Sequence, residues 1–276
     1  MSKYIVITGG ASGLGQQLAK KWAQQGWHVC IIDKNQQLAQ QVCQQIVDKG
    51  QQCMAIQCDI TDADSVSRAF HAIMQQWPRV DALVNNAGVA TADQFETESI
   101  EQWRWIFDIN LFGLINVTQQ FIPLFKQQGN GQIINIASQA ALTPIPFMAS
   151  YNASKSAVLS LSETLKIELA DDNIPVSVVC PGFFKTNLGS SLRTQLPIMA
   201  DLMHKMFSNS PLDAAQVADI IYQKSQAKQF LIQTHSQGKQ LFLLKQLLPW
   251  TRYLTMLINK TKGLRYKVKQ LQKDQS

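Results

Sequence analysis

The sequence predicts an α/β protein built on a doubly wound, seven-stranded parallel sheet, with helices on both faces and an extra helical segment at the C-terminus. Short runs rich in β-branched residues alternate along the chain with segments whose apolar residues recur at helical spacing. Glycines gather where the first such run turns into the first helix, and small or amide residues follow a later run. These positions correspond to the carboxyl ends of parallel strands, where such sheets bind ligands.

The expected elements follow in order. Strands are predicted at 4–8, 28–32, 53–57, 80–84, 133–137, 176–180 and 230–232. Helices are predicted after the first glycines up to Gly26, from about 38 to Gly50, from a cap at Thr61 to Trp77, and over 99–126, 151–171 and 213–224. Strand and helix alternate throughout, which is typical of a parallel sheet with crossover helices.

Composition favours one large domain with an appendage. Of the 276 residues, 46% are hydrophobic and 16% are charged, enough for a sizeable core. We expect one nucleotide-binding domain over 1–237, with a substrate lid at about 187–210, and a basic amphipathic helical extension over 238–276. The net charge is +6, but the residues from Lys239 onward alone carry +8. The basic excess therefore belongs to the tail, which argues against nucleic-acid binding by the domain.

Cysteine and histidine usage gives two further expectations. The five cysteines (Cys30, Cys43, Cys53, Cys58 and Cys180) show no CxxC spacing and mostly lie in apolar runs, so we expect buried free thiols in a reducing cytoplasm. Met1 runs almost directly into a short strand without a signal-peptide pattern, which also favours a cytoplasmic protein. The four histidines are scattered, and no metal site is expected.

The first strand leads into a glycine-rich turn, Thr8-Gly9-Gly10-Ala11-Ser12-Gly13-Leu14-Gly15. Such a turn exposes backbone N–H groups at the positive end of a helix dipole and lets a pyrophosphate approach closely. Asp33 ends the second strand, where a carboxylate can hydrogen-bond ribose hydroxyls and repel a 2′-phosphate. This favours NAD over NADP, although neighbouring Lys34 blurs the preference. Asp59 follows the third strand and either meets the adenine ring or only shapes its turn.

Tyr151 and Lys155 are four residues apart on a predicted helix, so their side chains share one face. A nearby ammonium favours the phenolate form of a tyrosine, which would suit it to acid/base chemistry. Asn110 lies among hydrophobic residues of a long helical run and needs a polar partner, either a backbone bend or a site. Ser138 is placed at the carboxyl end of the fifth strand.

Taken together, TGxxxGxG at Thr8 to Gly15, Asn85-Asn86-Ala87-Gly88, Asn110, Ser138, the YxxxK motif and Pro181-Gly182 resemble the short-chain dehydrogenase/reductase family. The resemblance covers roughly 3–186. It implies a Rossmann-like fold and an NAD(P)-dependent enzyme that interconverts an alcohol and a ketone or aldehyde. By this resemblance, Tyr151 is the acid/base, Lys155 holds the nicotinamide ribose, Ser138 binds the substrate oxygen and Asn110 anchors a water relay to the lysine.

The resemblance also implies a set of cofactor contacts. Thr186 would meet the nicotinamide carboxamide. The full expected set is Gly9, Ser12, Gly13, Leu14, Gly15, Asp33, Lys34, Asp59, Ile60, Asn86, Ala87, Gly88, Tyr151, Lys155, Pro181, Gly182 and Thr186. A homodimer or homotetramer built on the long helices is expected as well.

Apolar residues flank the expected site. An apolar, methionine-bearing wall adapts to bulky ligands, and the residues expected at the substrate are Ser138, Tyr151, Phe147, Phe183, Met199 and Met203. This predicts a lipophilic substrate of steroid-like, retinoid-like or long-chain type; the same stripe would also suit ordinary core or a subunit interface. In the tail, one helical face beside basic residues is expected to carry Trp250, Tyr253, Leu254, Leu257 and Ile258. That face can lie on an anionic membrane, cover the active site or meet another subunit. The alternative functions are a non-catalytic nucleotide sensor or scaffold and a peripheral membrane adaptor.

Overall fold

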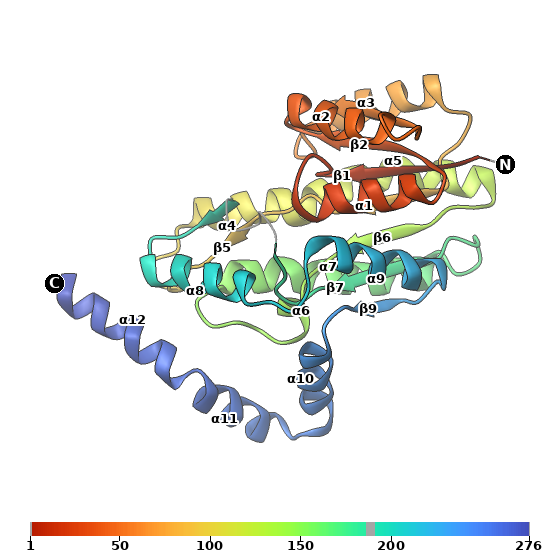
Figure 1. The fold of residues 1–276 in the computed structure, drawn as a ribbon. Helices are drawn as coiled ribbons and strands as arrows, with labels where there is room; N and C mark the ends of the chain where they lie inside the picture. Colours follow the sequence, from red (N-terminus) through yellow and green to blue (C-terminus); the bar gives the residue numbers. More distant parts are fainter. Residues whose placement is uncertain (1, 186–190, 276) are drawn as a thin grey trace.

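A computed structural model of the protein describes residues 2–185 and 191–275, with side chains as far as 270. Its centre is a seven-stranded sheet in the order β3-β2-β1-β4-β6-β7-β9 (Figure 1). Every strand pair in this sheet is parallel. The strands are β1 (Lys3–Thr8), β2 (Trp27–Asp33), β3 (Cys53–Gln57), β4 (Ala82–Asn85), β6 (Ile133–Ile136), β7 (Val176–Cys180) and β9 (Leu231–Gln233). The predicted fold class is confirmed.

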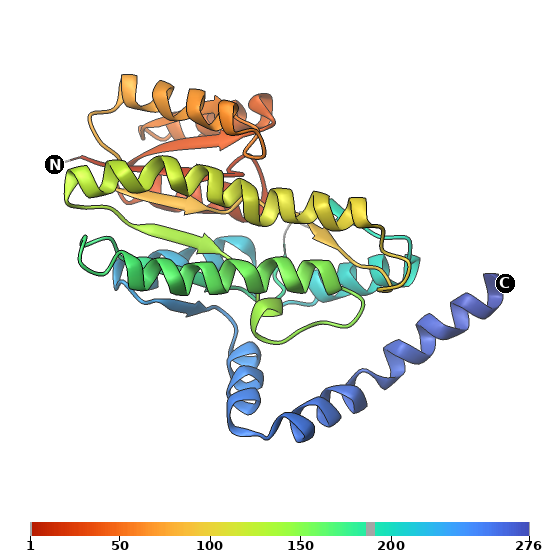
Figure 2. The same ribbon diagram turned by 180° about the vertical axis from the view of Figure 1, so that it is seen from behind.

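Helices cover both faces of the sheet. On one face lie α1 (Gly13–Gln24), α2 (Gln36–Val47) and α9 (Ala214–Gln226), whose apolar residues pack with those of β1 and β2. On the other face lie α3 (Ala63–Gln76), α5 (Gly113–Gln128) and α7 (Ala149–Glu168); the last two lie in front of the sheet, roughly along its strands, in Figure 2. Strands buried on both sides read as continuous apolar runs, which is why the sequence revealed them.

The strand order reverses between β1 and β4, because β2 and β3 continue on one side of β1 and the later strands on the other. The turn after β1 and the Asn85–Gly88 segment after β4 therefore meet at this reversal. In doubly wound sheets, ligands bind in the crevice at this point.

The long helical segment predicted over 99–126 is interrupted in the structure. It consists of α4 (Ile100–Phe107), a π-helical stretch η1 (Asp108–Phe112) and α5. Asn110 lies within the π-helical stretch. Such stretches often occur at functional sites, because the extra residue per turn redirects a side chain.

Two short strands form a second sheet that the sequence did not reveal. Ala90–Thr91 (β5) pairs in parallel with Leu192–Arg193 (β8). Beyond β8 comes α8 (Pro197–Ser208), which belongs to the predicted lid over 187–210. The lid therefore joins the segment after β4 through backbone pairing. Strands of two residues carry no detectable periodicity.

Two local predictions are wrong. Cys43 and Cys53 form a disulfide with their Cα atoms 5.1 Å apart, whereas Cys30, Cys58 and Cys180 are buried free thiols. The loop between α2 and β3 returns the chain onto its own helix, so two cysteines without a recognisable spacing come together. Asp62, and not Thr61, caps α3, because its carboxylate accepts from the N–H of Asp64 at 3.0 Å.

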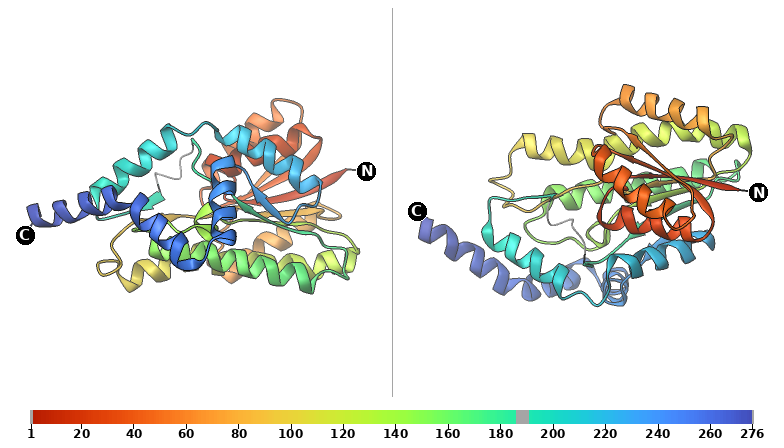
Figure 3. Two further views of the ribbon diagram at one scale, coloured as in Figure 1. Left: turned by 90° about the horizontal axis from the view of Figure 1, so that it is seen from below. Right: turned by 45° about the horizontal axis from the view of Figure 1, so that its top comes forward.

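The chain ends in three helices beyond the sheet. They are α10 (Ser236–Leu247), α11 (Trp250–Lys260) and α12 (Lys262–Gln275). Figure 3 shows α12 running beside α8, and Leu264 packs against the apolar cluster of the lid. Within the part of the chain that the structure describes, no helix has the length and apolar content needed to cross a membrane.

Candidate active site

The glycine-rich turn is packed too tightly to accept side chains. A Cβ atom on Gly15 would lie 2.1 Å from the carbonyl oxygen of Gly9, and one on Gly9, where φ is +63°, would lie 2.8 Å from the Cα of Ala87. Ser12 is the N-cap of α1, but its side chain makes no capping hydrogen bond. The first turn of α1 thus offers backbone donors to an anion, and the close backbone approach fits a dinucleotide pyrophosphate.

The segment after β4 is tied directly to this turn. Asn86 donates its side-chain amide to the carbonyls of Thr8 (3.0 Å) and Gly9 (3.1 Å). The backbone N–H groups of Asn86 and Ala87 both donate to the Thr8 hydroxyl at 2.9 Å. Asn86 and Ala87 therefore hold the segment after β4 and the glycine-rich turn after β1 together, and these two segments form the two sides of the crevice.

Asp33 is held at the carboxyl end of β2 by two backbone donors. Its carboxylate accepts from the N–H of Ala11 (3.0 Å) and from that of Asn35 (2.9 Å). It faces an open cleft of about 730 Å³ lined by Asp33, Lys34, Asn35, Gln36, Gln37, Gln40 and Gln57. The structure thus places a fixed carboxylate at the carboxyl end of β2, on the edge of this cleft.

Lys34 and Asp59 form an ion pair beside this cleft, with Nζ 2.8 Å from Oδ2. The hydrogen bond from Lys34 is the main reason why the pKa of Asp59 lies below its usual value. Asp59 also accepts from the N–H (3.0 Å) and hydroxyl (2.7 Å) of Thr61, so it does shape its turn. Ile60 packs into the core against α5. A Cβ atom on Gly113 would lie 2.6 Å from the Cδ1 of Ile60, so the two residues are in close contact.

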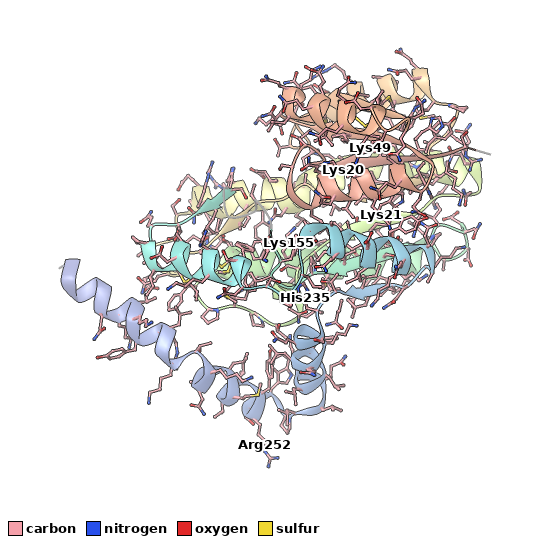
Figure 4. All side chains as sticks on the ribbon, in the orientation of Figure 1. Lys20, Lys21, Lys49, Lys155, His235 and Arg252 are labelled. Atoms are coloured by element: carbon pink, nitrogen blue, oxygen red, sulfur yellow. A yellow bond between two sulfur atoms is a disulfide. The ribbon has the colours of Figure 1, made fainter. Side chains whose placement is uncertain are left out.

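Tyr151 and Lys155 lie on the same face of α7, as predicted, and both are buried, with 7% and 5% of their surfaces exposed. Tyr151 hydrogen-bonds to Ser138 from the loop after β6. Lys155 donates to the carbonyl oxygen of Ile136 at 3.1 Å. Figure 4 shows Lys155 near the centre of the molecule. Two neighbouring elements thus bring the hydroxyl, phenol and ammonium groups together.

Burial dominates the proton affinities of this pair. It raises the pKa of Tyr151, against the opposing effect of the Ser138 hydrogen bond, and it lowers the pKa of Lys155 to about 8. We expected the ammonium to lower the pKa of the phenol, but the cost of burying a phenolate outweighs the favourable contacts. The phenol is therefore protonated at neutral pH and is ready to act as an acid.

Asn110 completes this centre from the π-helical stretch. Its Oδ1 accepts from the N–H of Val89 (2.9 Å), and its Nδ2 donates to the carbonyl of Val89 (3.1 Å) and to the hydroxyl of Ser154 (3.0 Å). A Cβ atom on Gly88 would lie 3.1 Å from both the Asn110 Oδ1 and the Lys155 Nζ. Asn110, Gly88 and Lys155 therefore converge at one point.

The expected substrate residues gather around Tyr151. Met199 and Met203 of α8 are buried in one apolar cluster with Tyr151 and Met148, and Phe147 and Phe183 pack against it. The rings of Phe183 and Phe207 are 5.5 Å apart. The predicted contact at Thr186 lies outside the described residues.

Sequence reasoning missed the residues that fasten the lid. The buried carboxylate of Asp93 accepts from the N–H of Gln195 at 2.6 Å and from the side-chain amide of Gln102 at 2.8 Å. The guanidinium of Arg193 lies over the ring of Trp105 at 3.6 Å. An acidic residue in a run of small and apolar ones was the available signal for Asp93.

A dinucleotide crevice beside a buried tyrosine and lysine defines an NAD(P)-dependent oxidoreductase. The sequence profile described as short chain dehydrogenase matches residues 3–197, and the chain belongs to this family. A dehydrogenase/reductase of Lactiplantibacillus plantarum, named for CLA biosynthesis, is 35% identical over 189 residues, covering 67% of this chain and 66% of that protein. The match thus spans slightly less than two thirds of that relative's length. A 3-oxoacyl-[acyl-carrier-protein] reductase of Staphylococcus aureus is 32% identical, with coverage of 71% and 80%.

Solved structures agree with this assignment. A short-chain dehydrogenase/reductase from Burkholderia phymatum in complex with NAD superposes with a TM-score of 0.84 at 27% identity, covering 89% of this chain and 93% of that one. A 3-ketoacyl-(acyl-carrier-protein) reductase from Brucella melitensis complexed with NADH gives 0.74 at 30% identity, with coverage of 84% and 96%. NAD is accordingly the cofactor of this enzyme class, with NADP as the alternative.

Proposed function

We propose that the protein interconverts a lipophilic alcohol and its ketone or aldehyde, with NAD as its preferred cofactor. The observation that carries this proposal is the group formed by the buried Tyr151, Lys155 and Asn110 and the half-buried Ser138, next to the apolar cluster of the lid. A polar centre of this kind costs folding free energy, and it is retained where it performs chemistry.

The bound cofactor supplies or accepts the hydride. In the reductive direction, Tyr151 donates its phenolic proton to the carbonyl oxygen as negative charge develops there. Ser138 hydrogen-bonds the same oxygen, which orients the substrate and stabilises that charge. In the oxidative direction, Tyr151 takes the hydroxyl proton.

Lys155 and Asn110 support this proton transfer. The Lys155 ammonium favours the charged form of the phenol in the oxidative direction and holds the nicotinamide ribose. Asn110 holds the backbone at Val89 next to Lys155 and anchors the water through which the lysine exchanges protons with solvent. The three hydrogen bonds of Asn110 keep its side chain in place for this role.

The preference for NAD rests on Asp33. Its carboxylate is fixed by two backbone N–H groups, so it cannot turn away from a 2′-phosphate without losing both bonds. Lys34, a cation that lines the same cleft, is paired with Asp59. Electrostatic repulsion therefore disfavours NADP.

The lipophilic substrate class rests on the lid. Met199 and Met203 are buried beside Tyr151, and Phe147 and Phe183 extend the same apolar surface. Methionine side chains adjust their shape to bulky apolar ligands. The relatives named as 3-oxoacyl-[acyl-carrier-protein] reductases support a long-chain compound within this class.

Turnover with a mixed panel tests the proposal. The purified protein is given NADH or NADPH with steroid-like, retinoid-like and long-chain ketones, together with small sugars and polyols in the reverse direction, and cofactor absorbance is followed. We expect turnover of the lipophilic compounds with NADH. Turnover of small polar compounds alone would reject the substrate class, and binding of NADH without any turnover would favour a nucleotide sensor or scaffold.

A membrane contact through the tail is a second proposal, favoured by its exposed apolar residues. Leu247 is 71% and Trp250 is 64% exposed, and Leu243, Leu254 and Ile258 are exposed as well. Exposed cations accompany them, including Arg252, which points away from the domain in Figure 4. Apolar and basic residues together bind anionic lipid surfaces. Co-sedimentation with phosphatidylglycerol vesicles, but not with phosphatidylcholine vesicles, is expected; no sedimentation with either would refute the contact.

We also propose that the enzyme acts in the cytoplasm as a homodimer or homotetramer. Ile100 and Phe112, on the long helical segment, are exposed apolar residues that a second copy could cover. The Cys43–Cys53 disulfide removes the argument from free thiols for a reducing compartment, so the cytoplasmic location stays a prediction. Sedimentation velocity would measure the assembly, and a monomer at micromolar concentration would refute it.

A further inference from the structure

Three loops at the carboxyl ends of neighbouring strands are linked in a row. The N–H of Gln139, after β6, donates to the carbonyl of Pro181 at 2.8 Å. The N–H of Gly182, after β7, donates to Nδ1 of His235 at 3.1 Å. His235 follows β9 and is the N-cap residue of α10. The loop that carries Ser138, the Pro181–Gly182 loop and the start of the C-terminal extension are therefore joined.

The first helix of the extension also packs against α6 (Gln139–Leu142), which begins directly after Ser138. The side-chain amide of Gln139 donates to the carbonyl of Gly238 at 3.1 Å, and Lys245 donates to the carbonyl of Leu142 at 2.6 Å. A Cβ atom on Gly238 would lie 2.3 Å from the Gln139 amide oxygen, so the two helices meet without room for a side chain. α10 therefore contacts both the first and the last residue of α6.

The tautomer of His235 follows from the hydrogen bond that the backbone N–H of Gly182 donates to it. A backbone N–H can only donate, so Nδ1 must be an unprotonated acceptor and the ring is neutral, with its proton on Nε2. Nε2 is buried and has no hydrogen-bond partner among the described residues. Leaving a buried donor unpaired costs roughly 1–3 kcal/mol. Structural packing alone would be served better by an apolar residue, whereas the Gly182 contact requires an acceptor.

We propose that His235 and Gln139 are positioning residues, through which the C-terminal extension sets the spacing between Ser138 and the loop that contacts the nicotinamide end of the cofactor. The inference rests on the proposed function, because it takes Pro181–Gly182, which the family resemblance places among the cofactor contacts shortly before Thr186, as that loop. The His235 ring stands directly behind Gly182, where a Cβ atom would be 2.9 Å from its Cγ. Displacing His235 therefore moves the loop. In Figure 4, His235 lies between the sheet and the tail, close to Lys155 in projection.

A matched pair of neutral variants tests the role of His235. In His235→Asn the amide replaces the atoms near Nδ1, so an acceptor for Gly182 is kept; in His235→Gln the amide lies nearer the position of Nε2, so that acceptor is lost. Calorimetry with NADH and with ADP-ribose, which lacks the nicotinamide, separates the two ends of the cofactor. For His235→Gln we expect NADH binding to weaken about tenfold while ADP-ribose binding changes less than about twofold, the loss of one hydrogen-bonded contact.

His235→Asn is expected to bind NADH as the unchanged protein does. Equal weakening of NADH and ADP-ribose in His235→Gln would indicate a general disturbance of the fold and overturn the inference, as would unchanged binding of both. If the unchanged protein binds neither ligand, the proposed function itself fails, and the two failures are thereby distinguished.

Gln139→Met provides a second, independent measurement. Methionine keeps the length of the side chain but removes its hydrogen bond to Gly238, while the Gln139 backbone N–H still reaches Pro181. We expect kcat to fall about fivefold with NADH binding unchanged, because the substitution detaches from the extension only the loop that carries Ser138. An unchanged kcat would remove Gln139 from the positioning role.

Discussion

The catalytic centre and the C-terminal extension invert the usual distribution of polar and apolar residues in opposite ways. Around Tyr151, the side chains of Asn110, Ser154 and Lys155 are buried within the core. On the extension, Leu247 and Trp250 are largely exposed. Buried polar groups and clustered exposed apolar groups both cost free energy in an isolated chain.

The two regions differ in how that cost is offset. At the catalytic centre, Asn110 makes three hydrogen bonds and Lys155 makes one, so the structure itself satisfies most of the buried groups. On the extension, Tyr253 is buried and Leu264 packs on the lid, but the exposed face has no such compensation within the described residues. The buried polar groups of the centre thus find partners within this chain, whereas the exposed face of the extension is suited to a contact outside it.

The largest expected effect is at Tyr151. Tyr151→Phe removes the phenolic proton but keeps the ring in the apolar cluster, so kcat should fall about 10³-fold in both directions, the magnitude typical of a lost general acid/base. Stopped-flow or steady-state assays measure the rate. The thermal midpoint and the dissociation constant for NADH serve as controls and should stay unchanged; full turnover would remove Tyr151 from the chemistry.

Lys155 offers a test of whether the buried polar centre is kept for function at the expense of stability. Burial lowers its pKa from 10.5 to about 8, which corresponds to about 3 kcal/mol of lost stability at pH 7. Lys155→Met should lower kcat about 10²-fold while raising the free energy of unfolding by about 1–2 kcal/mol, the remainder being lost with the bond to Ile136.

The sign of the pH dependence provides the control for Lys155. Because its folded pKa lies below the unfolded one, the unfolded chain binds more protons between about pH 8 and 10.5, and the unchanged protein gains stability as the pH rises through this window. The advantage of Lys155→Met should therefore shrink between pH 7 and 10. Urea unfolding at both pH values measures it, and a constant difference would contradict the assigned cause.

Asp93 holds the lid, whose apolar cluster also contacts Leu264 of the extension. Asp93→Asn places an amide where two donors, the Gln195 N–H and the Gln102 side chain, now meet a carboxylate, so at least one contact is lost. We expect KM for the lipophilic substrate to rise about tenfold with little change in kcat, because the lid contributes binding and not proton transfer. Asn at this position with an unchanged KM would show that the strand pairing of β5 and β8 alone fixes the lid.

The sequence predicted the sheet and the pairing of Tyr151 with Lys155 on one helical face, because both depend on local patterns. Runs such as Val176–Cys180 are buried on both faces and therefore continuously apolar, and Tyr151 and Lys155 need only helical spacing to meet. Other contacts join single residues that are far apart in the sequence, as where Asp93 accepts from Gln195 and His235 accepts from Gly182. No periodic pattern in the sequence predicts such contacts, and none predicts the Cys43–Cys53 disulfide or the π-helical turn at Asn110.

The direction of the Tyr151 pKa was missed for a related physical reason. Helical spacing places an ammonium near the phenol, but it does not report how completely both are buried. In the folded protein the loss of hydration is the larger effect on each group. Burial depends on the lid and on the loop after β6, which lie outside the motif itself.

The smallest expected effect on folding is on the exposed face of the extension. Replacing both Leu247 and Trp250 with Ser should change the free energy of unfolding by less than about 0.5 kcal/mol per site, because largely exposed side chains gain little from folding. Tyr253→Ala is the matched control from the same helix as Trp250; Tyr253 is only 1% exposed, and its loss should cost about 3 kcal/mol.

The double variant should at the same time lose its co-sedimentation with phosphatidylglycerol vesicles, while turnover of a water-soluble ketone stays unchanged. That combination would show that the exposed face serves an external contact, because neither folding nor chemistry uses it. A loss of stability comparable to that of Tyr253→Ala would instead place Leu247 and Trp250 in the packed part of the extension. The contrast between a self-sufficient catalytic centre and an outward-directed tail would then no longer hold.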